Sequence, residues 1–443
     1  MDETKRKMLG WPAILCLLCA LGPFPLPGRA WANGFDIYEH GAKIVGMAGA
    51  FTAVADDPST IAFNPAGLSQ LAGTQVSLGA SAIMPSSKFR TDGNPLMGTT
   101  PGAYWTISDK TWIVPNAFIT HRINEKVSIG LGTYTPFGLG VEWPGDFEGR
   151  FTPGVRKAVL LTNTISPAIS FKITDRLAVG VAPYAQYFDI ELQNSVLFAP
   201  PFPVPPLSPG RNLNATALAR LVGHTWGYGA NGGILYRITD SVTFGAAYMS
   251  EVRQKITNGT QDVARLSDGA LLKTQDFSGT ITLPSSIRMG LAWKQAPWVV
   301  SVDAWWTEWS RYDTLSAYFA DGTSLTVPKN WHNTWYLRSG VQYSINKYLD
   351  VRAGFSWEDT PIPRGTVDPL IPSGRRKVYA AGVGIHMGKM TLDFGYNYVQ
   401  DQSIRWNNIA GDVNLGTVAL TRVTGTFYDT YAHVVNGSIT YRF

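Results

Sequence analysis

Histidine is the side chain best suited to acid–base chemistry near neutral pH, and this sequence has six. They are His40, His121, His224, His332, His386 and His433. None stands in a recognisable Ser–His motif, and there is no metal-ligand cluster, phosphate loop or redox cysteine pair. The sequence therefore predicts no catalytic residue, no metal and no cofactor. A lipid hydrolase stays open as a rival, because triad residues can meet in space alone.

The first 32 residues have the pattern of a secretory signal peptide. Lys5, Arg6 and Lys7 give a basic start, an apolar stretch follows, and Ala30-Trp31-Ala32 is a small-x-small cleavage pattern. A retained helical anchor is the alternative, but the apolar run is short for a membrane span. Both cysteines lie in this segment, so the mature chain is expected to have none.

The composition favours a membrane protein built from strands. Charged residues make up 16% of the chain, against about 25% in soluble domains. Aromatic residues make up 12%, yet no stretch after the signal approaches the roughly 18 apolar residues of a membrane helix. An exported chain of this kind indicates a β-barrel of the Gram-negative outer membrane. The net charge of +5 is too small to indicate nucleic acid.

The end of the chain shows the alternation of a membrane strand. From Tyr431 to Phe443, odd positions are largely apolar or aromatic and even positions mostly polar. This pattern is typical of a strand between lipid and lumen. The terminal Phe443 resembles the signal read by barrel-assembly machinery, which is therefore an expected partner. Outer-membrane lipid and lipopolysaccharide are the other expected surroundings.

A repeated turn divides the chain into strands. Residues 122–126, 172–176 and 237–241 share one form, and residues 343–347 are a looser copy. Long connections lie between these short turns, as in outer-membrane barrels. Counting two strands per long connection predicts an all-β fold. It is a transmembrane antiparallel β-barrel of about 14 strands over residues 73–443, expected to be a monomer.

Residues 33–72 do not fit a strand pattern. They are rich in Ala and Gly, and they precede the first strand at the periplasmic rim. A barrel of this size has a lumen too wide for its own side chains to fill. We therefore predict that this segment is a hatch, or plug, inside the lumen.

Apolar side chains are expected both inside the barrel and on its outer loops. Strand alternation points Trp305, Trp309 and Met249 into the lumen, although a lipid-facing girdle is an alternative for Trp309. Two long loops are unusually apolar and could form a ligand groove. Its residues are Val196, Leu197, Phe198, Phe202, Leu207, Leu266, Leu271 and Leu272. Packing of the two loops on each other is the alternative.

Several motifs in order resemble the FadL family of outer-membrane transporters of long-chain fatty acids and hydrocarbons. Ala55-Asp56-Asp57 followed by Asn64-Pro65-Ala66 looks like the family's hatch motif, and Pro136-Phe137-Gly138 is similar to its third strand. The resemblance implies that Asp56, Asp57, Asn64, Pro65 and Ala66 belong to the hatch. It also implies passive capture of a hydrophobic ligand and sideways release at a kink formed by Pro136, Phe137 and Gly138. Purely structural roles for Asn64 and Pro65, and helix capping by the two aspartates, remain open.

One stretch departs from the family pattern. Fatty-acid members carry a cation near the end of the fifth strand, where this chain has Asp189-Ile190-Glu191-Leu192. An anionic head group would be repelled there unless Arg220, Arg253 or another cation compensates in the lumen. Fatty acid is the leading ligand, neutral aromatic or aliphatic hydrocarbon is the alternative, and a general porin for polar solutes is the rival from another class.

Overall fold

The structure is a computed structural model that describes residues 34–93, 99–150, 154–197, 216–407 and 423–443. Within these residues, 21 strands join one antiparallel sheet. Four strands lie in the long connections, and three barrel strands are each interrupted once. This leaves the 14-stranded barrel that the sequence predicts, and the prediction is confirmed.

The barrel strands follow one another around the wall in chain order. They are β1 (Thr74–Thr91), β3 (Trp112–Arg122), β4 (Val127–Tyr134) with β5 (Gly138–Glu142), β6 (Lys157–Lys172), β7 (Leu177–Leu197), β8 (Thr216–Arg237), β9 (Val242–Met249) with β10 (Val252–Arg265), β11 (Leu271–Leu283) with β12 (Ser286–Gln295), β13 (Trp298–Thr307), β16 (Thr334–Asn346), β17 (Leu349–Glu358), β18 (Arg376–Met387), β19 (Met390–Asp401) and β21 (Thr424–Arg442). The barrel closes because β1 pairs with both β3 and β21, so that Val76 lies opposite Ile119 on one side and Tyr441 on the other.

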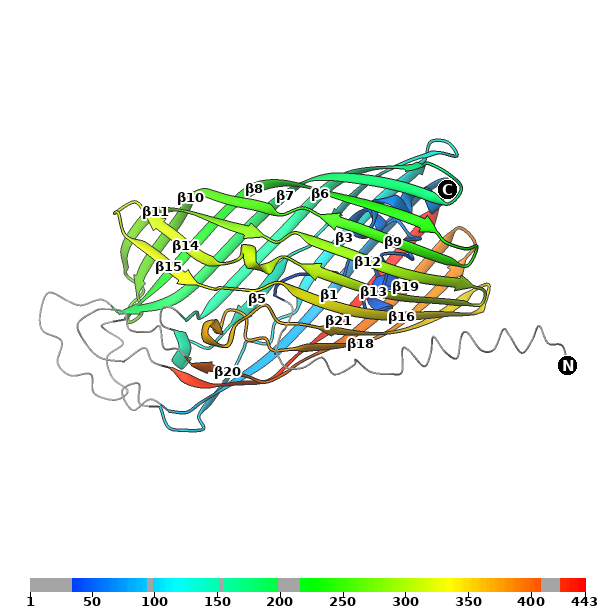
Figure 1. Cartoon of the computed structure of the whole chain (residues 1–443). Coiled ribbons are helices and arrows are strands. Elements are labelled where there is room, and N and C mark those ends of the chain that lie inside the picture. The colour runs from blue at the N-terminus through cyan, green and yellow to red at the C-terminus, as the bar shows by residue number, and fades with distance from the viewer. Residues whose placement is uncertain (1–33, 94–98, 151–153, 198–215, 408–422) are drawn as a thin grey trace, which may run out of the picture. The chain divides into compact units, whose positions relative to one another are not determined.

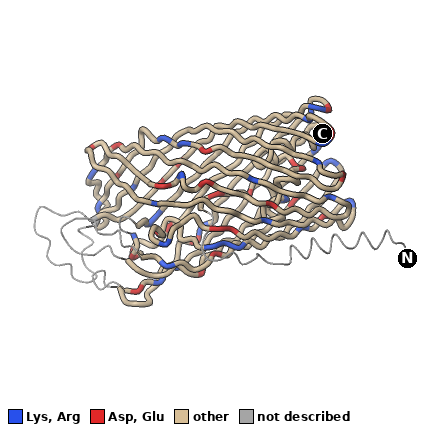
Figure 2. Tube along the Cα trace, in the orientation of Figure 1, with Lys and Arg blue, Asp and Glu red and all other residues tan. Residues whose placement is uncertain are grey.

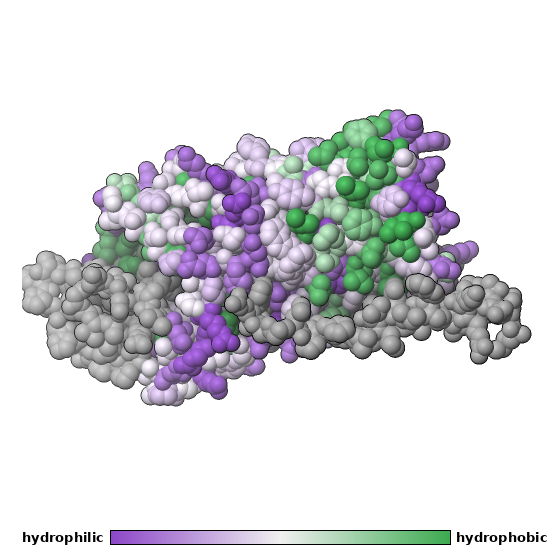
Figure 3. All heavy atoms as spheres, in the orientation of Figure 1, coloured by the Kyte–Doolittle hydropathy of each residue, from purple (hydrophilic) through white to green (hydrophobic). Residues whose placement is uncertain are grey.

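The outward face carries an apolar belt. Leu78, Ile119, Leu131 and Ile439 are among its exposed side chains. Buried polar residues, namely Ser77, Thr120 and Thr440, stand beside the first, second and fourth of these. Figure 3 shows hydrophobic residues gathered on the half of the barrel that bears the short turns, and hydrophilic residues on the other half. This is the outward band of a transmembrane barrel.

The long connections contain more structure than the sequence indicated. The stretch 311–332, expected as a loop, holds the hairpin of β14 (Thr314–Phe319) and β15 (Ser324–Pro328), and β14 pairs with β11. Further pieces are β2 (Tyr104–Thr106), η3 (Glu148–Arg150), η5 (Trp309–Arg311), η6 (Arg364–Thr366) and β20 (Ile404–Asn407). The strands in Figure 1 therefore extend on this side well beyond the apolar belt that Figure 3 shows.

Residues 34–71, called here the N-terminal segment, lie among inward-facing side chains of the wall. The segment contains α3 (Ala42–Gly46), α4 (Thr60–Phe63) and η1 (Pro65–Gln70). The helix α3 contacts β17, β18, β19 and β21, and η1 contacts β3, β4, β6, β7 and β8. Contacts on both sides of a closed wall place the segment in the lumen, near the short-turn end (Figure 1). No helix in the described part of the chain is long and apolar enough to cross a membrane.

Candidate ligand-binding site

The third barrel strand is interrupted at Pro136, where the sequence predicts a kink. β4 ends at Tyr134 and β5 begins at Gly138, because proline has no N–H to offer a ladder. The wall stays attached to β6 at this point. The Phe137 N–H donates to Thr162 Oγ1 (3.0 Å), and that hydroxyl donates to the Phe137 carbonyl (2.7 Å).

The interruption removes the pairing between β3 and β5. β3 pairs with β4 only from Ala117 to Arg122, and β5 pairs with β6. The Trp112 side chain lies across the unpaired stretch. Its indole is so close to Gly140 that a Cβ at that glycine would come within 2.7 Å of the indole nitrogen. One tryptophan of β3 therefore covers the backbone of β5 where the ladder is missing.

The N-terminal segment supplies a backbone partner on the lumenal side of the break. Asp36 forms an isolated antiparallel bridge with Phe137. The Ile37 N–H donates to the Pro136 carbonyl (2.9 Å), and the Gly138 N–H donates to the Phe35 carbonyl (3.0 Å). The kinked wall and the lumenal segment are thus joined by main-chain hydrogen bonds.

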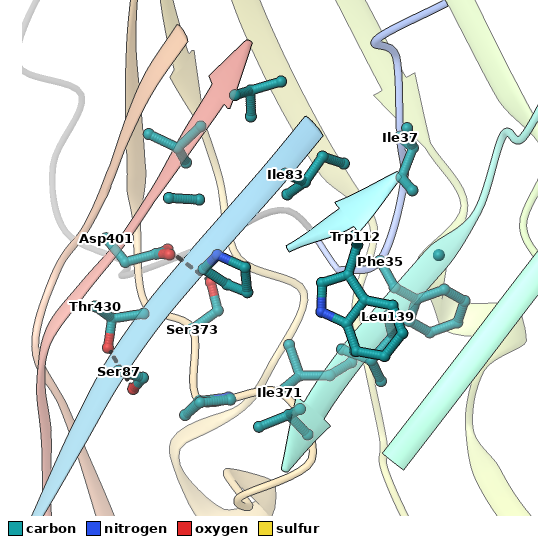
Figure 4. A pocket seen from close by; sticks show the side chains of 18 of the residues that line it. Phe35, Ile37, Ile83, Ser87, Trp112, Leu139, Ile371, Ser373, Asp401 and Thr430 are labelled. Carbon is teal, nitrogen blue, oxygen red and sulfur yellow. Dashed lines mark hydrogen bonds between the residues drawn. The ribbon is translucent and has the colours of Figure 1, made fainter. Parts of the chain in front are cut away.

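A cavity of about 200 Å³ lies beside the break (Figure 4). It is bounded by the N-terminal segment, β1, β3, β5 and the connection before β18. Its lining includes Phe35, Ile37, Ile83, Trp112, Val114, Leu139, Val141, Leu370, Ile371, Ser373, Arg376, Asp401 and Thr430.

The two sides of this cavity differ in polarity. Figure 4 shows Phe35, Ile37, Trp112 and Leu139 on one side, and Ser373 and Asp401 on the other. Arg376 joins the polar side, where its Nε donates to Asp401 Oδ1 (3.1 Å) and to Ser373 Oγ (3.2 Å). An amphipathic guest could place its tail and its head group against different walls.

Two acids of the N-terminal segment also line the cavity. Burial raises the pKa of Asp36 to about 6 and the pKa of Glu39 to about 7. Both lie on the lumenal segment and not on a membrane strand. Their charge therefore changes near neutral pH, and the electrostatic repulsion of an anion in the cavity changes with it.

A second, much smaller apolar cavity of about 10 Å³ lies beside the first. It shares Phe35, Leu139 and Leu370 with the first, and Ile190 and Leu315 complete its wall together with other aliphatic residues. The apolar residues that line both cavities, such as Phe35, Leu139 and Leu370, belong to or pack against one buried apolar cluster in this part of the barrel.

Trp309 packs against Phe35, which lines both cavities. The predicted lumenal position agrees with its burial, and its ring centroid lies 4.9 Å from that of Phe35 and 6.3 Å from that of Phe137. Its indole N–H donates to the Tyr336 hydroxyl (2.8 Å). Trp309 thus touches both the N-terminal segment and the strand break.

Trp305 and Met249 face inward as predicted, and neither lines the cavity. The Trp305 ring lies against Tyr38 and Phe63, with the guanidinium of Arg288 4.5 Å and that of Arg338 4.3 Å from its centre. The Met249 sulfur lies 3.8 Å from Arg288 Nη2. Both therefore contact Arg288 of the barrel wall.

The predicted lumenal positions of Arg220 and Arg253 are wrong. Along β8 and β10 the buried side chains are the neighbours of these arginines in the alternation, so both arginines face outward. Arg220 pairs with Glu191 (2.7 Å), which is also bonded to Lys157. Asp189 has the same outward parity. The acids of the fifth strand therefore do not face a lumenal ligand, and the lumen needs no compensation for them.

The predicted groove is described only in part. Leu271 and Leu272 are exposed, with 64% and 40% of their surface accessible, and Val196 and Leu266 are half-buried. Leu197 ends β7. Phe198, Phe202 and Leu207 lie outside the described residues.

Asn64 anchors the N-terminal segment to the barrel wall. Its amide donates to the carbonyls of Thr52 (2.9 Å) and Ile234 (3.1 Å), and its Oδ1 accepts from the Ala66 N–H (3.2 Å). Pro65 then opens η1. The wall approaches closely here because Gly233 has no side chain, and a Cβ at that position would collide with the Asn64 side chain.

The two aspartates of the segment have different partners. Asp56 pairs with Lys43 (2.7 Å) and with Lys294 of β12 (3.4 Å). Burial alone would raise its pKa, but the two lysines outweigh this and hold the pKa of Asp56 well below its usual range. Asp57 accepts from the Ser59 N–H (2.9 Å) just before α4. Asp56 therefore joins the segment to the wall through Lys294, whereas Asp57 bonds to the backbone at the start of α4.

Charged wall residues receive the backbone of the segment. Asp303 accepts the N–H groups of Phe51 (3.0 Å) and Thr52 (2.8 Å), and Arg338 donates to the Ala48 carbonyl (3.1 Å). Arg338 is itself paired with the buried Glu358 (2.8 Å). Buried charge is stable here because each group is bonded.

Sequence reasoning did not single out Trp112, Arg376 or Asp401. A signal for the first was present in Pro115, because a proline inside a strand marks an unpaired edge. Arg376 and Asp401 meet through the β18–β19 register, for which neither residue carries a local signal. No group of three or more His, Cys, Asp or Glu side chains that could hold a metal occurs in the described ranges.

Known proteins resemble this chain over nearly its whole length. A putative outer membrane protein of Neisseria meningitidis serogroup B is 25% identical and covers 93% of this chain and 95% of its own. A long-chain fatty acid transport protein of Escherichia coli O6:H1 is 24% identical, over 86% of this chain and 90% of its own.

Solved structures share the fold. A Pseudomonas aeruginosa FadL homologue aligns with a TM-score of 0.77 at 21% identity, over 93% of this chain and all of that one. The Pseudomonas putida toluene transporter TodX aligns with a TM-score of 0.69 at 17% identity, over 93% and 99% of the two chains.

The family comparison agrees with the barrel and with the motifs. Residues 26–443 match the family described as outer membrane protein transport protein (OMPP1/FadL/TodX). This confirms the resemblance seen in the sequence and the location in the Gram-negative outer membrane. The chain belongs to the OMPP1/FadL/TodX family of outer-membrane transport proteins.

Proposed function

We propose that this protein takes up long-chain fatty acids or similar hydrophobic compounds by passive transport. The amphipathic cavity at the break between β4 and β5 carries this proposal. A relative named as a long-chain fatty acid transport protein and a structural neighbour named as a toluene transporter support a hydrophobic cargo. The proposed organisation is a signal peptide (1–32), a hatch (33–72) and a monomeric barrel (73–443).

The proposed route begins at the long loops and ends in the membrane. Exposed Leu271 and Leu272 belong to the capture groove, and the apolar cavities lead inward from the loop side to the strand break. Release through the wall suits an apolar ligand, because entry into periplasmic water would cost it the free energy of apolar hydration.

The N-terminal segment is the proposed hatch for this route. Its residues 35–37 are bonded to residues 136–138 at the lumenal side of the break. A ligand leaving sideways must pass this contact and the Trp112 side chain over Gly140. Each intramolecular hydrogen bond contributes about 1 kcal/mol net to stability. The free energy of ligand binding is therefore large enough to offset the loss of the two hydrogen bonds at this contact.

The polar wall of the cavity favours a ligand with a head group. Arg376 can offer further N–H donors to a carboxylate besides those used by Asp401 and Ser373. Neutral hydrocarbons are the second candidate, because Asp36, Glu39 and Asp401 outnumber that arginine in the cavity lining. Raised pKa values reduce the negative charge of the first two.

Binding of a fluorescent long-chain fatty acid to the purified protein tests the proposal, with fatty acids and neutral alkanes as competitors. Leu139→Trp fills the region shared by the two cavities, and we expect about tenfold weaker binding, equal to about 1.4 kcal/mol. Leu131→Trp, on the outward face of β4, is the matched control and should bind as the parent protein does. Displacement by alkanes alone would favour the hydrocarbon alternative. Binding that is not saturable, or is unaffected by Leu139→Trp, would overturn the cavity as the binding site.

A further inference from the structure

Three neighbouring short turns begin with a basic residue at the same position. Arg122, Lys172 and Arg237 end β3, β6 and β8, and they open the repeated turn seen in the sequence. In each copy the following isoleucine donates its N–H to the carbonyl four residues later (2.8–3.0 Å). The turns are also joined sideways, because the N–H groups of Lys172 and Arg237 donate to carbonyls of the preceding turn (both 2.7 Å).

These three basic residues have the inward parity of their strands. Each stands two residues after a buried side chain: Thr120, Ser170 or Leu235. Arg122 confirms the direction, because its Nη2 donates to the Ser69 carbonyl of the N-terminal segment (3.1 Å). The turns thus bring basic side chains to the periplasmic mouth of the lumen, and Figure 2 shows Lys and Arg along this rim.

A cavity of about 600 Å³ lies between these turns and the segment. Its lining is Ser69, Gln70, Arg122, Glu125, Lys172, Thr174, Asp175, Arg176, Leu177, Ala178, Leu235, Arg237 and Thr243. Four of these residues are basic and two are acidic. Within the described residues, Lys172 pairs with Asp175 (2.8 Å), whereas Arg122, Arg176 and Arg237 have no carboxylate within ion-pair distance.

We infer that this periplasmic cavity is a binding site for a phosphate group. Guanidinium groups that share a cavity repel one another where the carboxylates of the lining do not neutralise them fully, and an anion between them reduces that repulsion. A lining excess of two positive charges matches a phosphate monoester, which carries about −1.5 to −2, better than a single carboxylate. The planar forks of arginine can also bind phosphate oxygens in pairs.

The phosphate has two possible sources at this rim. One is a soluble phosphate ester of the periplasm, and the other is the head group of a phospholipid in the inner leaflet. Leu177, Ala178 and Leu235 give the cavity an apolar wall that suits the organic part of either. Arg122 also donates a hydrogen bond to the Ser69 carbonyl. A phosphate bound to Arg122 would therefore change the protection of the η1 amides from hydrogen exchange.

The test is calorimetric titration of the full detergent-solubilised protein with glycerol 3-phosphate at fixed ionic strength. We expect saturable binding that is at least about tenfold weaker in Arg122→Gln/Arg237→Gln. Lys126→Gln is the matched control, since this exposed lysine lies in the first turn but does not line the cavity. Hydrogen exchange of residues 65–71 should change on titration in the parent protein and not in the double variant.

A repeat in nanodiscs distinguishes the sources. Loss of the titration when the bilayer contains phosphatidic acid, whose phosphate is also a monoester, would identify the lipid head group as occupant, and an unchanged titration would identify a soluble ester. Equal weakening by Lys126→Gln, or parent-like binding by the double variant, would mean an adventitious ion only and overturn the site. No hydrophobic ligand enters this experiment, so its outcome does not depend on the proposed transport.

Discussion

Arg376 is the only basic residue in the lining of the cavity beside the strand break, within the part of the chain that the structure describes. Its Nε is bonded to Asp401 and Ser373, which fixes the guanidinium at the polar wall. Arg376 is therefore the candidate for the carboxylate recognition that the sequence assigned to Arg220 or Arg253, both of which face outward.

Arg376→Met should separate the two ligand classes. Charge-assisted hydrogen bonds contribute about 1.5–3 kcal/mol, so we expect fatty-acid affinity to fall at least about tenfold while neutral alkane affinity stays within about twofold. The second substitution Asp401→Leu in the same chain removes the carboxylate that would otherwise be left buried. Lys377→Met, on the outward face of the same strand, is the matched control for competition binding. An equal loss for both ligands would show that Arg376 only shapes the cavity.

Asp36 and Glu39 predict a dependence on pH. Their pKa values are raised to about 6 and about 7, so both are mostly charged at about pH 8 and mostly neutral at about pH 5.5. An anion in the cavity is repelled in the first range and tolerated in the second. We expect an alkyl sulfonate, whose own charge is constant, to bind several-fold more tightly at about pH 5.5 than at about pH 8.

Two comparisons test the origin of this pH effect. Asp36→Asn/Glu39→Gln should flatten the profile at the tight-binding level, because both side chains are then neutral at every pH. A neutral alkane should show a flat profile in the parent protein. A sulfonate profile that keeps its slope in the double variant would assign the effect to other groups.

At the scale of elements, the contact between the N-terminal segment and the strand break is the proposed moving part. Asp36 and Phe137 face each other across an antiparallel bridge, so cysteines there can form a disulfide. The two natural cysteines lie before residue 33. We expect oxidised Asp36→Cys/Phe137→Cys to lose nearly all uptake of labelled fatty acid by cells and to regain it on reduction.

The control for that lock is a disulfide that joins only the wall. Val383 and Phe394 are paired between β18 and β19 and point away from the lumen. Oxidation of Val383→Cys/Phe394→Cys should leave uptake unchanged. Undiminished uptake by the oxidised Asp36→Cys/Phe137→Cys protein would mean that the contact need not open during transport.

Strands and their breaks were predictable because their signals are local. Period-2 alternation marks the wall, asparagine and threonine mark the short turns, and Pro136 marks the interruption after β4. The inward direction of Trp305, Trp309 and Met249 followed from the same alternation. The interruption between β11 and β12 contains the same signal in Pro284, whereas Ser250 and Glu251 between β9 and β10 carry no such signal.

The composition of the site was not predictable from local patterns. The cavity joins residues of the N-terminal segment, β1, β3, β5, β18 and β19, whose distances depend on barrel closure and register. Arg376 meets Asp401 only because β18 and β19 pair in one register. Arg220 was misplaced because β8 begins at Thr216, within a stretch that the sequence indicated as a long connection, so the face to which its side chain points could not be assigned.

At the scale of the whole molecule, the barrel consists of a closed wall and an N-terminal segment that lies in the lumen. Arg338 with Glu358 and Arg352 with Asp393 are ion pairs within the wall, at 2.8 and 2.6 Å. Removal of residues 34–71 would expose these pairs to water without breaking them. Asp303 would exchange its two backbone donors for water.

We therefore expect the chain lacking residues 34–71 to fold as a barrel and to conduct ions steadily in planar bilayers, while the full chain shows no such steady conductance. A wall of 14 strands encloses more space than its side chains fill, so water should occupy the lumen. Compact migration of the unheated protein in gels checks the fold, and the oxidised Asp36→Cys/Phe137→Cys protein is the closed control. A large steady conductance in the full chain would favour the porin alternative, because polar solutes would then pass a segment that was proposed to exclude them.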